Sequence, residues 1–291
     1  MVDLLILNYV DYETTQELVN RIKSYKSIAH ICIVDNASPN ESFEQLQNNC
    51  CDKIDVIQTP KNGGYGYGNN YGIKYLYEKY KSKYILLCNP DISITDVVIG
   101  HLENFLKNNN SYAIVAPAML DRNGIRQKNT AFKIGSVFEY IMSFGMLYSK
   151  VFKPGEYQLS TKINCEVIDV EAVAGSLFLL DTTKMIDNIM YDENVFLYCE
   201  ERILGMKCKE ANLKIALLPQ YTFIHNHSVS ISKTVDSEVK KRRLMNKSAM
   251  YVIKNYYKAN LFEILLGKIM MSISIGEMKV LEKIKGKRHG K

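Results

Sequence analysis

Several apolar runs in this 291-residue chain end in side chains that could bind a metal or a ligand. The run Tyr84–Cys88 is followed by Asn89, Pro90 and Asp91, and proline ends a strand because it has no N–H for the sheet. A carboxylate at the carboxyl end of a central strand lies where open α/β sheets bind ligands. Asp91 is therefore a candidate ligand for a Mg²⁺ or Mn²⁺ ion that holds a diphosphate, and a simple Pro-Asp turn is the alternative.

Two more polar side chains follow apolar runs. His225 comes after a late run, and an imidazole nitrogen is an acceptable ligand for Mn²⁺, although a lone histidine more often has a structural role. Asp35 ends the run Ile31–Val34. Its carboxylate could accept a hydrogen bond from a base N–H or a ribose hydroxyl, but a turn with a helix N-cap explains this site equally simply.

Two adjacent acids, Glu200 and Glu201, lie near the start of a segment with helical spacing, Phe196–Ala211. Successive side chains on a helix point about 100° apart, so the two cannot face one pocket equally. One of them could take a proton from a hydroxyl as a general base. The alternative is that acids in the first turn stabilise the helix dipole.

A segment rich in glycine and asparagine, residues 61–70, follows the third apolar run. Its four glycines would let the backbone approach a ligand closely, and the helix expected after it offers free N–H groups. The segment is not a dinucleotide-binding fingerprint, because that motif follows the first strand. A flexible loop is the alternative.

Hydrophobic spacing predicts the elements that must position these side chains. In the first 120 residues, short apolar runs alternate with helical patterns. The runs cover residues 2–7, 31–34, 54–57, 84–88 and 113–116, and the helical patterns cover 14–25, 41–48, 70–81 and 97–106. This order predicts an α/β fold with a mostly parallel sheet and helices on both faces. A late strand, Ile215–Leu218, is expected to end at Pro219.

Composition is typical of a soluble domain with a full core, since 47% of the residues are hydrophobic and 23% are charged. The seven cysteines form no C-x-x-C pair, which favours free thiols in a reducing cytoplasm. The first residues lack the basic region of a signal peptide, so none is expected.

Positive charge is concentrated at the end of the chain. Residues 240–291 hold 14 Lys/Arg and 3 Asp/Glu, a net charge of +11, whereas the remaining residues hold 23 and 28, a net charge of −5. Such a tail favours an anionic surface, with lipid ahead of nucleic acid because the tail is also apolar. Leu261–Ile275 is too short to span a bilayer. A basic amphipathic helix on a membrane and a helix packed on the domain are equally consistent with it.

The motifs, in their order along residues 2–257, resemble those of family 2 glycosyltransferases, in particular the bacterial rhamnosyltransferase-like branch of O-antigen and capsule synthesis. The residues that carry the resemblance are Leu7–Tyr9, Val34–Ser38, Asn62–Gly66 with Asn70, Asn89–Asp91, Asp121–Gly124, Ala174–Ser176, Phe196–Glu201, and His225 with Ser230. Each motif is weak alone, whereas the ordered set is specific.

The resemblance implies a GT-A fold and a role for each candidate residue. Asn89 and Asp91 resemble a DxD-type motif, His225 the histidine that completes a Mn²⁺ or Mg²⁺ site, and Glu201 the catalytic base, with Glu200 as its substitute. Residues expected to contact the nucleotide-sugar are Asn8, Tyr9, Asp35, Asn62, Gly63, Asn89 and Gly175. The implied domain covers residues 1–235, with a nucleotide-binding half at 1–120 and an acceptor-binding half at 121–235, and a basic helical tail follows at 236–291.

The resemblance also implies an activity: inverting transfer of one sugar, rhamnose being one candidate, from a UDP- or dTDP-sugar to a lipid-linked oligosaccharide. The protein would lie on the inner face of a bacterial plasma membrane, and a homodimer is a further expectation. Three departures stand out: Ile203 replaces a usual aspartate, Val10 a common asparagine, and there is no tryptophan. A non-catalytic glycosyltransferase-like subunit that binds a partner or a membrane is the alternative.

Overall fold

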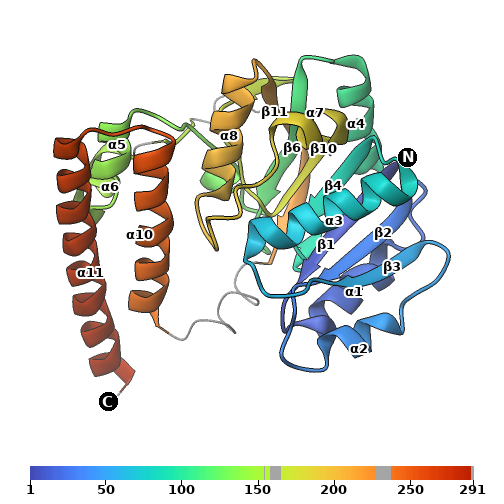
Figure 1. Ribbon diagram of the computed structural model, residues 1–291, viewed down its shortest axis with the longest axis horizontal. Coiled ribbons are helices and arrows are strands. Elements are labelled where there is room, and N and C mark those ends of the chain that lie inside the picture. Colours follow the sequence, from blue (N-terminus) through green and yellow to red (C-terminus); the bar gives the residue numbers. More distant parts are fainter. Residues whose placement is uncertain (154, 158–164, 227–236, 290–291) are drawn as a thin grey trace.

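The computed structural model describes residues 1–153, 155–157, 165–226 and 237–289, and Figure 1 shows an α/β fold around one central sheet. The first half of the sheet is parallel and has the strand order β3-β2-β1-β4. Its elements are β1 (Val2–Asn8), α1 (Tyr12–Ile22), β2 (Ile28–Asp35), α2 (Ser42–Gln47), β3 (Ile54–Gln58), α3 (Tyr65–Tyr80) and β4 (Tyr84–Cys88). The predicted alternation of strand and helix is therefore present.

The second half of the sheet is mixed. It continues in the order β10-β6-β11-β5, and β10 runs antiparallel to both of its neighbours. Its elements are β5 (Ile92–Ser93), α4 (Asp96–Asn108), β6 (Tyr112–Leu120), β8 (Ile168–Val170), β10 (Leu177–Asp181), α7 (Thr182–Asn188), α8 (Glu200–Glu210) and β11 (Lys214–His225). The α/β class is confirmed, while parallel pairing dominates only from β3 to β4.

Helices cover both faces of the sheet, as the sequence predicts. Alternate residues of each central strand face opposite sides, so Leu4 and Ile6 pack toward α1 and α4 while Leu5 packs toward α3. One hydrophobic core lies on each face, and the central strands are buried on both. This burial explains why these strands appear in the sequence as continuous apolar runs.

Helix α3 begins at Tyr65, five residues before the predicted start at Asn70. Its glycines allow the helix to pack tightly on β1, because a Cβ at Gly68 would lie 2.4 Å from Leu7 Cδ1 and one at Gly72 would lie 2.3 Å from Leu5 Cδ1. The predicted ligand-binding loop, residues 61–70, was therefore too long, because its second half belongs to α3. Much of the glycine pattern serves contact between helix and sheet.

Strand β11 does not end at Pro219, contrary to the prediction from the sequence. It continues to His225, with an irregular register between Leu218 and Thr222 where the proline is accommodated. A bulge is one of the few sheet positions that tolerate a residue without an N–H. The extension matters because it carries His225 to β5.

An irregular segment connects β6 to β10. It contains a 3-10 turn (Lys128–Thr130), β7 (Ala131–Phe132), α5 (Val137–Met142), α6 (Met146–Phe152) and β9 (Ala172–Val173), with β7 paired to β9. The expected turn at Asp121–Gly124 is present, since the Gly124 N–H donates to the Asp121 carbonyl.

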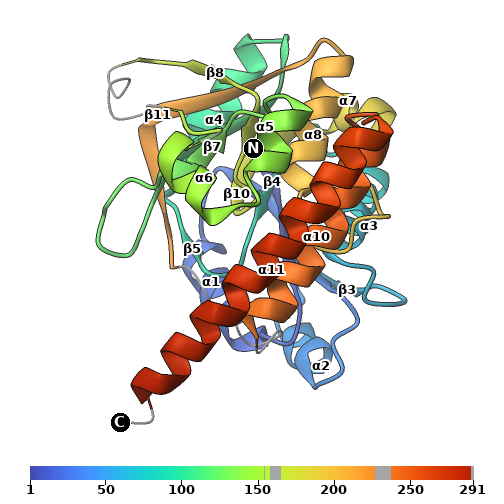
Figure 2. The same cartoon turned by 90° about the vertical axis from the view of Figure 1, so that its left-hand side faces the viewer.

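Two long helices, α10 (Glu238–Asn255) and α11 (Leu261–His289), end the chain. Figure 2 shows them side by side, with α11 outermost. They form a third hydrophobic cluster with α5 and α8, in which Ile141, Ile203 and Val252 are fully or almost fully buried. Within the described part of the chain, no helix is long and apolar enough to cross a bilayer.

Candidate active site

Residues from the carboxyl ends of the parallel strands line a cavity of about 430 Å³. Seven of the candidate residues lie on its wall: Tyr9, Asn62, Asn89, Gly175, Glu200, Glu201 and His225. They come from six separate segments. Tyr9, Asn62 and Asn89 follow strands of the parallel half of the sheet, whose carboxyl ends lie at one edge. The fold therefore gathers most of the predicted site into one place.

Asp91 and His225 meet beside this cavity. Asp91 lies between β4 and β5, His225 is the last residue of β11, and β11 pairs with β5 so that His225 lies opposite Ile92. The distance from His225 Nε2 to Asp91 Oδ1 is 3.1 Å, and both side chains are largely buried. Two predicted metal ligands that are 134 residues apart in the sequence are thus neighbours.

The pair fits a divalent cation that a substrate diphosphate would help to hold. Two ligands at right angles around an octahedral cation, each about 2.1 Å away, lie about 3 Å from one another, close to the observed separation. The described residues contain no group of three acidic, histidine or cysteine side chains that could hold a metal alone. Mg²⁺ commonly binds through one or two carboxylates together with substrate phosphates.

The charge of the cavity wall supports the same conclusion. Among the described residues that line it, three are acidic, Asp11, Glu200 and Glu201, and none is Lys or Arg. A diphosphate would find no Lys or Arg there to balance its charge, so a cation that came with it would supply that balance. The fit of Asp91 and His225 to a cation therefore has a second, independent basis.

Glu200 and Glu201 are the first two residues of α8. The preceding residues, Tyr198 and Cys199, have φ angles of +70° and +73°, so the chain turns sharply into the helix just before the two carboxylates. Left-handed backbone is costly for residues other than glycine and is concentrated at functional sites. This turn places both side chains against the cavity.

The two carboxylates have different surroundings. Glu201 Oε1 accepts a hydrogen bond from the Gly175 N–H at 3.1 Å, and a Cβ at Gly175 would lie 2.7 Å from that oxygen. Glu200 is 5% exposed, and its Oε1 has no hydrogen-bond partner within the part of the chain described. Burial raises the pKa of both carboxyl groups, and the charge of Glu201 raises the pKa of Glu200 further.

The raised pKa of Glu200 predicts a pH-dependent gain in stability when the charge is removed. The unfolded carboxyl loses its proton near its ordinary pKa of 4.5, whereas the folded one retains it to higher pH, so the fold loses stability as pH rises through this window. Glu200→Gln should therefore be more stable than the parent by more than about 1 kcal/mol at pH 8. At pH 4 the two should agree. Urea denaturation at both values measures the difference.

Glu139→Gln is the matched control for that experiment. Glu139 is exposed, and hydrogen bonds from Ser136 lower the pKa of its carboxyl. It should show no gain at pH 8. Equal behaviour of the two variants would contradict the assignment of a destabilising buried charge to Glu200.

Two predicted nucleotide contacts, Asn8 and Asp35, lie beneath the cavity wall, and both are 0% exposed. The Asp35 carboxylate accepts hydrogen bonds from Asn8 Nδ2 at 2.9 Å, from the Ser38 N–H at 2.9 Å and from Gln58 Nε2 at 3.1 Å. In this structure its oxygens thus serve to hold the turn after β2. Its contact with a base or ribose stays a prediction, as does that of Gly63, which also lies off the wall.

Asn36, which the sequence reasoning did not select, lies on the cavity wall in place of Asp35. Its Nδ2 donates to Asn62 Oδ1 and to the Gly64 carbonyl, each at 3.1 Å, and so ties the end of β2 to the start of α3. Because side chains alternate along a strand, the residue after Asp35 points the other way. That alternation along β2 was the signal in the sequence that could have identified Asn36.

Helix α10 and the residue that follows it hold the loop that leads into the two glutamates of α8. Tyr251 and Tyr256 donate their hydroxyls to Asp192 Oδ2 at 2.9 and 2.7 Å, and Ser248 donates to the Leu197 carbonyl at 2.6 Å. Leu244 of the same helix lines the cavity. The tail is therefore part of the framework of the site. Ser230, named in the resemblance, lies outside the described residues.

Gly64 is the position where this framework leaves no room for a side chain. Its φ is +94°, and a Cβ would lie 2.1 Å from the Phe196 carbonyl oxygen. We expect Gly64→Ala to lose about 1–3 kcal/mol from backbone strain, with a further loss from the clash, and to weaken nucleotide binding by moving the Phe196 loop. Chemical denaturation and calorimetry measure the two effects.

The control is Gly124→Ala, where φ is +78° but nothing lies within 4 Å of the added Cβ. It should show only the cost of left-handed backbone, about 1–2 kcal/mol, and unchanged nucleotide binding. Equal losses in both variants would show that the contact with Phe196 is unimportant.

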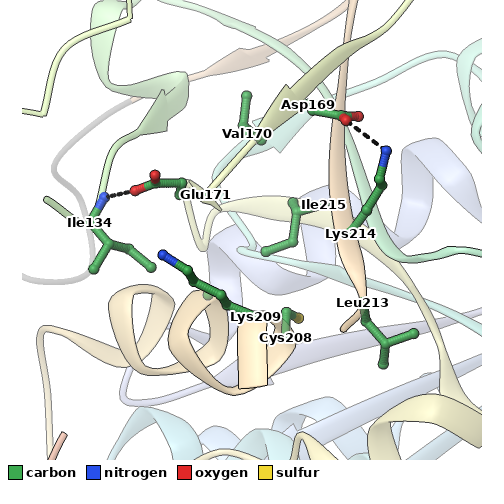
Figure 3. Close-up of a pocket in the computed structure, with 10 residues that line it drawn as sticks. Ile134, Asp169, Val170, Glu171, Cys208, Lys209, Leu213, Lys214 and Ile215 are labelled. Atoms are coloured by element: carbon green, nitrogen blue, oxygen red, sulfur yellow. Dashed lines mark hydrogen bonds and ion pairs between the residues drawn. The ribbon is translucent and has the colours of Figure 1, made fainter. Parts of the chain in front are cut away.

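A second, smaller cavity of about 170 Å³ lies between α8 and the start of β11 (Figure 3). Three of its charged side chains are already paired: Lys214 Nζ lies 2.9 Å from Asp169 Oδ2, and Glu171 accepts from the Ile134 N–H. The Lys214–Asp169 pair is more than half exposed, so it adds little to stability. This cavity is not a candidate for catalysis.

Comparison with known proteins finds related glycosyltransferases. The protein-family model for glycosyl transferase family 2 matches residues 3–159. The low-salt glycan biosynthesis hexosyltransferase Agl10 of Haloferax volcanii is 28% identical over 230 residues, which cover 79% of this chain and 69% of that protein. The rhamnosyltransferase WbbL of Escherichia coli K12 is 22% identical over 231 residues, covering 77% and 83% of the two chains.

Solved structures show the same fold. The chain resembles Staphylococcus aureus TarS 1–349 with a TM-score of 0.53 and 16% identity, covering 94% of this chain and 70% of TarS. It resembles GalNAc-T7, solved with UDP, GalNAc and Mn²⁺, with a TM-score of 0.60 and 13% identity, covering 88% of this chain and 50% of that one. These likenesses show the GT-A fold of glycosyltransferases. With a family model that matches more than half of its length, this chain belongs to glycosyl transferase family 2.

Proposed function

We propose that the protein is a metal-dependent inverting glycosyltransferase of surface polysaccharide synthesis. It would move one sugar from a UDP- or dTDP-sugar to a hydroxyl of a lipid-linked oligosaccharide, as in capsule or O-antigen assembly. The observation that carries this proposal is that one cavity has two glutamates with raised carboxyl pKa values on its wall and the Asp91–His225 pair beside it.

The chemistry follows from the roles of these residues. Glu201 accepts the proton of the acceptor hydroxyl, and the raised pKa of its carboxyl makes it a stronger base than an exposed glutamate. The freed oxygen bonds to the anomeric carbon from the face opposite the diphosphate, the bond from carbon to diphosphate oxygen breaks, and its electron pair leaves with the diphosphate. One displacement inverts that carbon. A cation held by Asp91 and His225 would neutralise charge on the diphosphate.

Other residues would position the substrates. In the proposed division, residues 1–120 bind the nucleotide, residues 121–235 bind the acceptor, and residues 236–291 form the tail. Asn36 and Asn62 lie on the wall near the ends of β2 and β3 and offer amide groups to the nucleotide. The absence of a side chain at Gly175 leaves room for the Glu201 carboxylate, because a Cβ there would collide with it.

The activities of two relatives support the substrate class. Agl10 is described as a hexosyltransferase and WbbL as a rhamnosyltransferase, so a hexose or deoxyhexose donor is the first expectation. A lipid-linked acceptor implies a peripheral position on the inner face of the plasma membrane. A homodimer remains part of the proposal.

Donor hydrolysis by the purified full chain tests this function. With Mn²⁺, one member of a panel of UDP- and dTDP-sugars should be hydrolysed faster than the others, and EDTA should stop the reaction. Calorimetry should show binding of UDP or dTDP that depends on Mn²⁺. Absence of both hydrolysis and Mn²⁺-dependent binding would favour a non-catalytic subunit.

A further inference from the structure

The outward face of α11 carries a row of apolar side chains that nothing in the described structure covers. Leu261, Phe262, Leu265, Ile269, Ile273 and Val280 are between 47% and 85% exposed. Residues 262, 265, 269, 273 and 280 recur at intervals of three, four and seven, which places them on one side of a helix. At 1.5 Å per residue the row is about 27 Å long. We call it the α11 stripe.

The charge next to the α11 stripe is of one sign. From Leu261 to Lys283, the exposed charged residues of the helix are three lysines, Lys268, Lys279 and Lys283. A rotation of about 100° per residue places all three along the same edge of the stripe. The exposed face of this helix is thus apolar in the centre and positive along one side.

The acids of α11 bind N–H and hydroxyl groups of the protein instead of lying fully exposed. Glu263 accepts from the Asn260 N–H, Glu277 from the Met146 N–H, and Glu282 from Ser237 Oγ and the Val239 N–H. The contacts of Glu277 and Glu282 join α11 to the start of α6 and to the start of α10, and the contact of Glu263 caps α11 itself, so each of these carboxylates already has a hydrogen-bond donor. Between Leu261 and Lys283, an anionic partner would therefore meet lysines as the exposed charged side chains, while the carboxylates are less exposed and already hydrogen-bonded.

A lipid surface matches this pattern better than a second copy of the chain. Two copies packed through the same stripe would bring like-charged lysine edges into one interface, which disfavours association. An amphipathic helix with an apolar face and flanking lysines instead lies in the interface plane of an anionic bilayer. An apolar face of this extent is also unusual on a monomer that contacts only water.

We propose that the α11 stripe is the membrane-binding surface of the protein, with its apolar side chains at the acyl boundary and its lysines at the phosphates of anionic lipids. The proposal deepens the proposed function, because a lipid-linked acceptor would then be held near the site. Only α10 separates α11 from the cavity, since α11 packs on α10 and Leu244 of α10 lines the cavity wall. One helix is about 10 Å across.

Vesicle sedimentation with the full chain tests the proposal. The protein should bind vesicles of phosphatidylcholine with phosphatidylglycerol at least about tenfold more tightly than phosphatidylcholine alone. The double variant Leu265→Asp/Ile269→Asp should lose binding to both. The triple variant Lys268→Glu/Lys279→Glu/Lys283→Glu should lose the preference for anionic vesicles. Val97→Asp, at a 68% exposed position on α4, is the matched control and should bind like the parent.

Three results would overturn the proposal. The first is vesicle binding by the double variant that equals that of the parent, and the second is no vesicle binding by either protein. The third is a parent protein that is a dimer by light scattering and does not bind vesicles, together with a double variant that is a monomer. That result would assign the stripe to contact with a second copy of the chain. Nucleotide-sugar hydrolysis, measured without vesicles, separates the two hypotheses: its absence with normal vesicle binding would remove the enzymatic function alone.

Discussion

Glu201→Gln should lose sugar transfer by about 10²–10⁴-fold while it binds the nucleotide as tightly as the parent. Glutamine keeps an oxygen that can accept from the Gly175 N–H, so the wall of the cavity should stay in place. It cannot take the proton of an attacking hydroxyl. Transfer kinetics and calorimetry with UDP or dTDP and Mn²⁺, on the same preparations, separate the two effects.

Glu200→Gln is the comparison that identifies the base. Glu200 is deeply buried, and its Oε1 has no hydrogen-bond partner in the described structure, so its replacement should cost less activity than that of Glu201. The opposite ranking, with transfer lost in Glu200→Gln and kept in Glu201→Gln, would make Glu200 the base. Loss of nucleotide binding in either variant would point to a misfolded cavity.

Local pattern was enough to predict most strands of the sheet. Tyr84–Cys88 was predicted to the residue, because a strand buried on both faces leaves an unbroken apolar run that Pro90 ends. The start of α3 was missed because glycine is a poor helix former in isolation. Contact of Gly68 and Gly72 with β1 overrides that preference, and such contact depends on the whole sheet.

Some residues of the candidate site could be found from the local sequence, and others could not. Side chains at the carboxyl ends of strands, such as Asn89 and His225, were found from the sequence and do lie on the wall. The choice between Asp35 and Asn36 needed the direction of each side chain at the end of β2, and a shift of one residue reverses it. The contacts of Tyr251 and Tyr256 with Asp192 join residues 59 and 64 positions apart and leave no local signal.

The loss of metal-dependent binding should be largest when the carboxylate beside His225 is removed. We expect Asp91→Ala and the isosteric Asp91→Asn both to abolish nucleotide-sugar turnover while the protein stays folded. The amide that Asp91→Asn introduces could still pair with His225, so that variant separates loss of charge from loss of packing.

The physical reason lies in the balance of charge around the cavity. Its described wall has three acids and neither Lys nor Arg, so a cation would favour the entry of a diphosphate, and Asp91 is the carboxylate placed to hold one beside His225. Calorimetry should therefore show that Mn²⁺ no longer strengthens UDP or dTDP binding to either variant, with melting curves as the check on folding. Asp169→Asn, at an exposed ion pair of the smaller cavity, is the control and should behave like the parent. Normal turnover by Asp91→Asn would remove Asp91 from the proposed metal site, because the amide brings no charge to balance that of the cation.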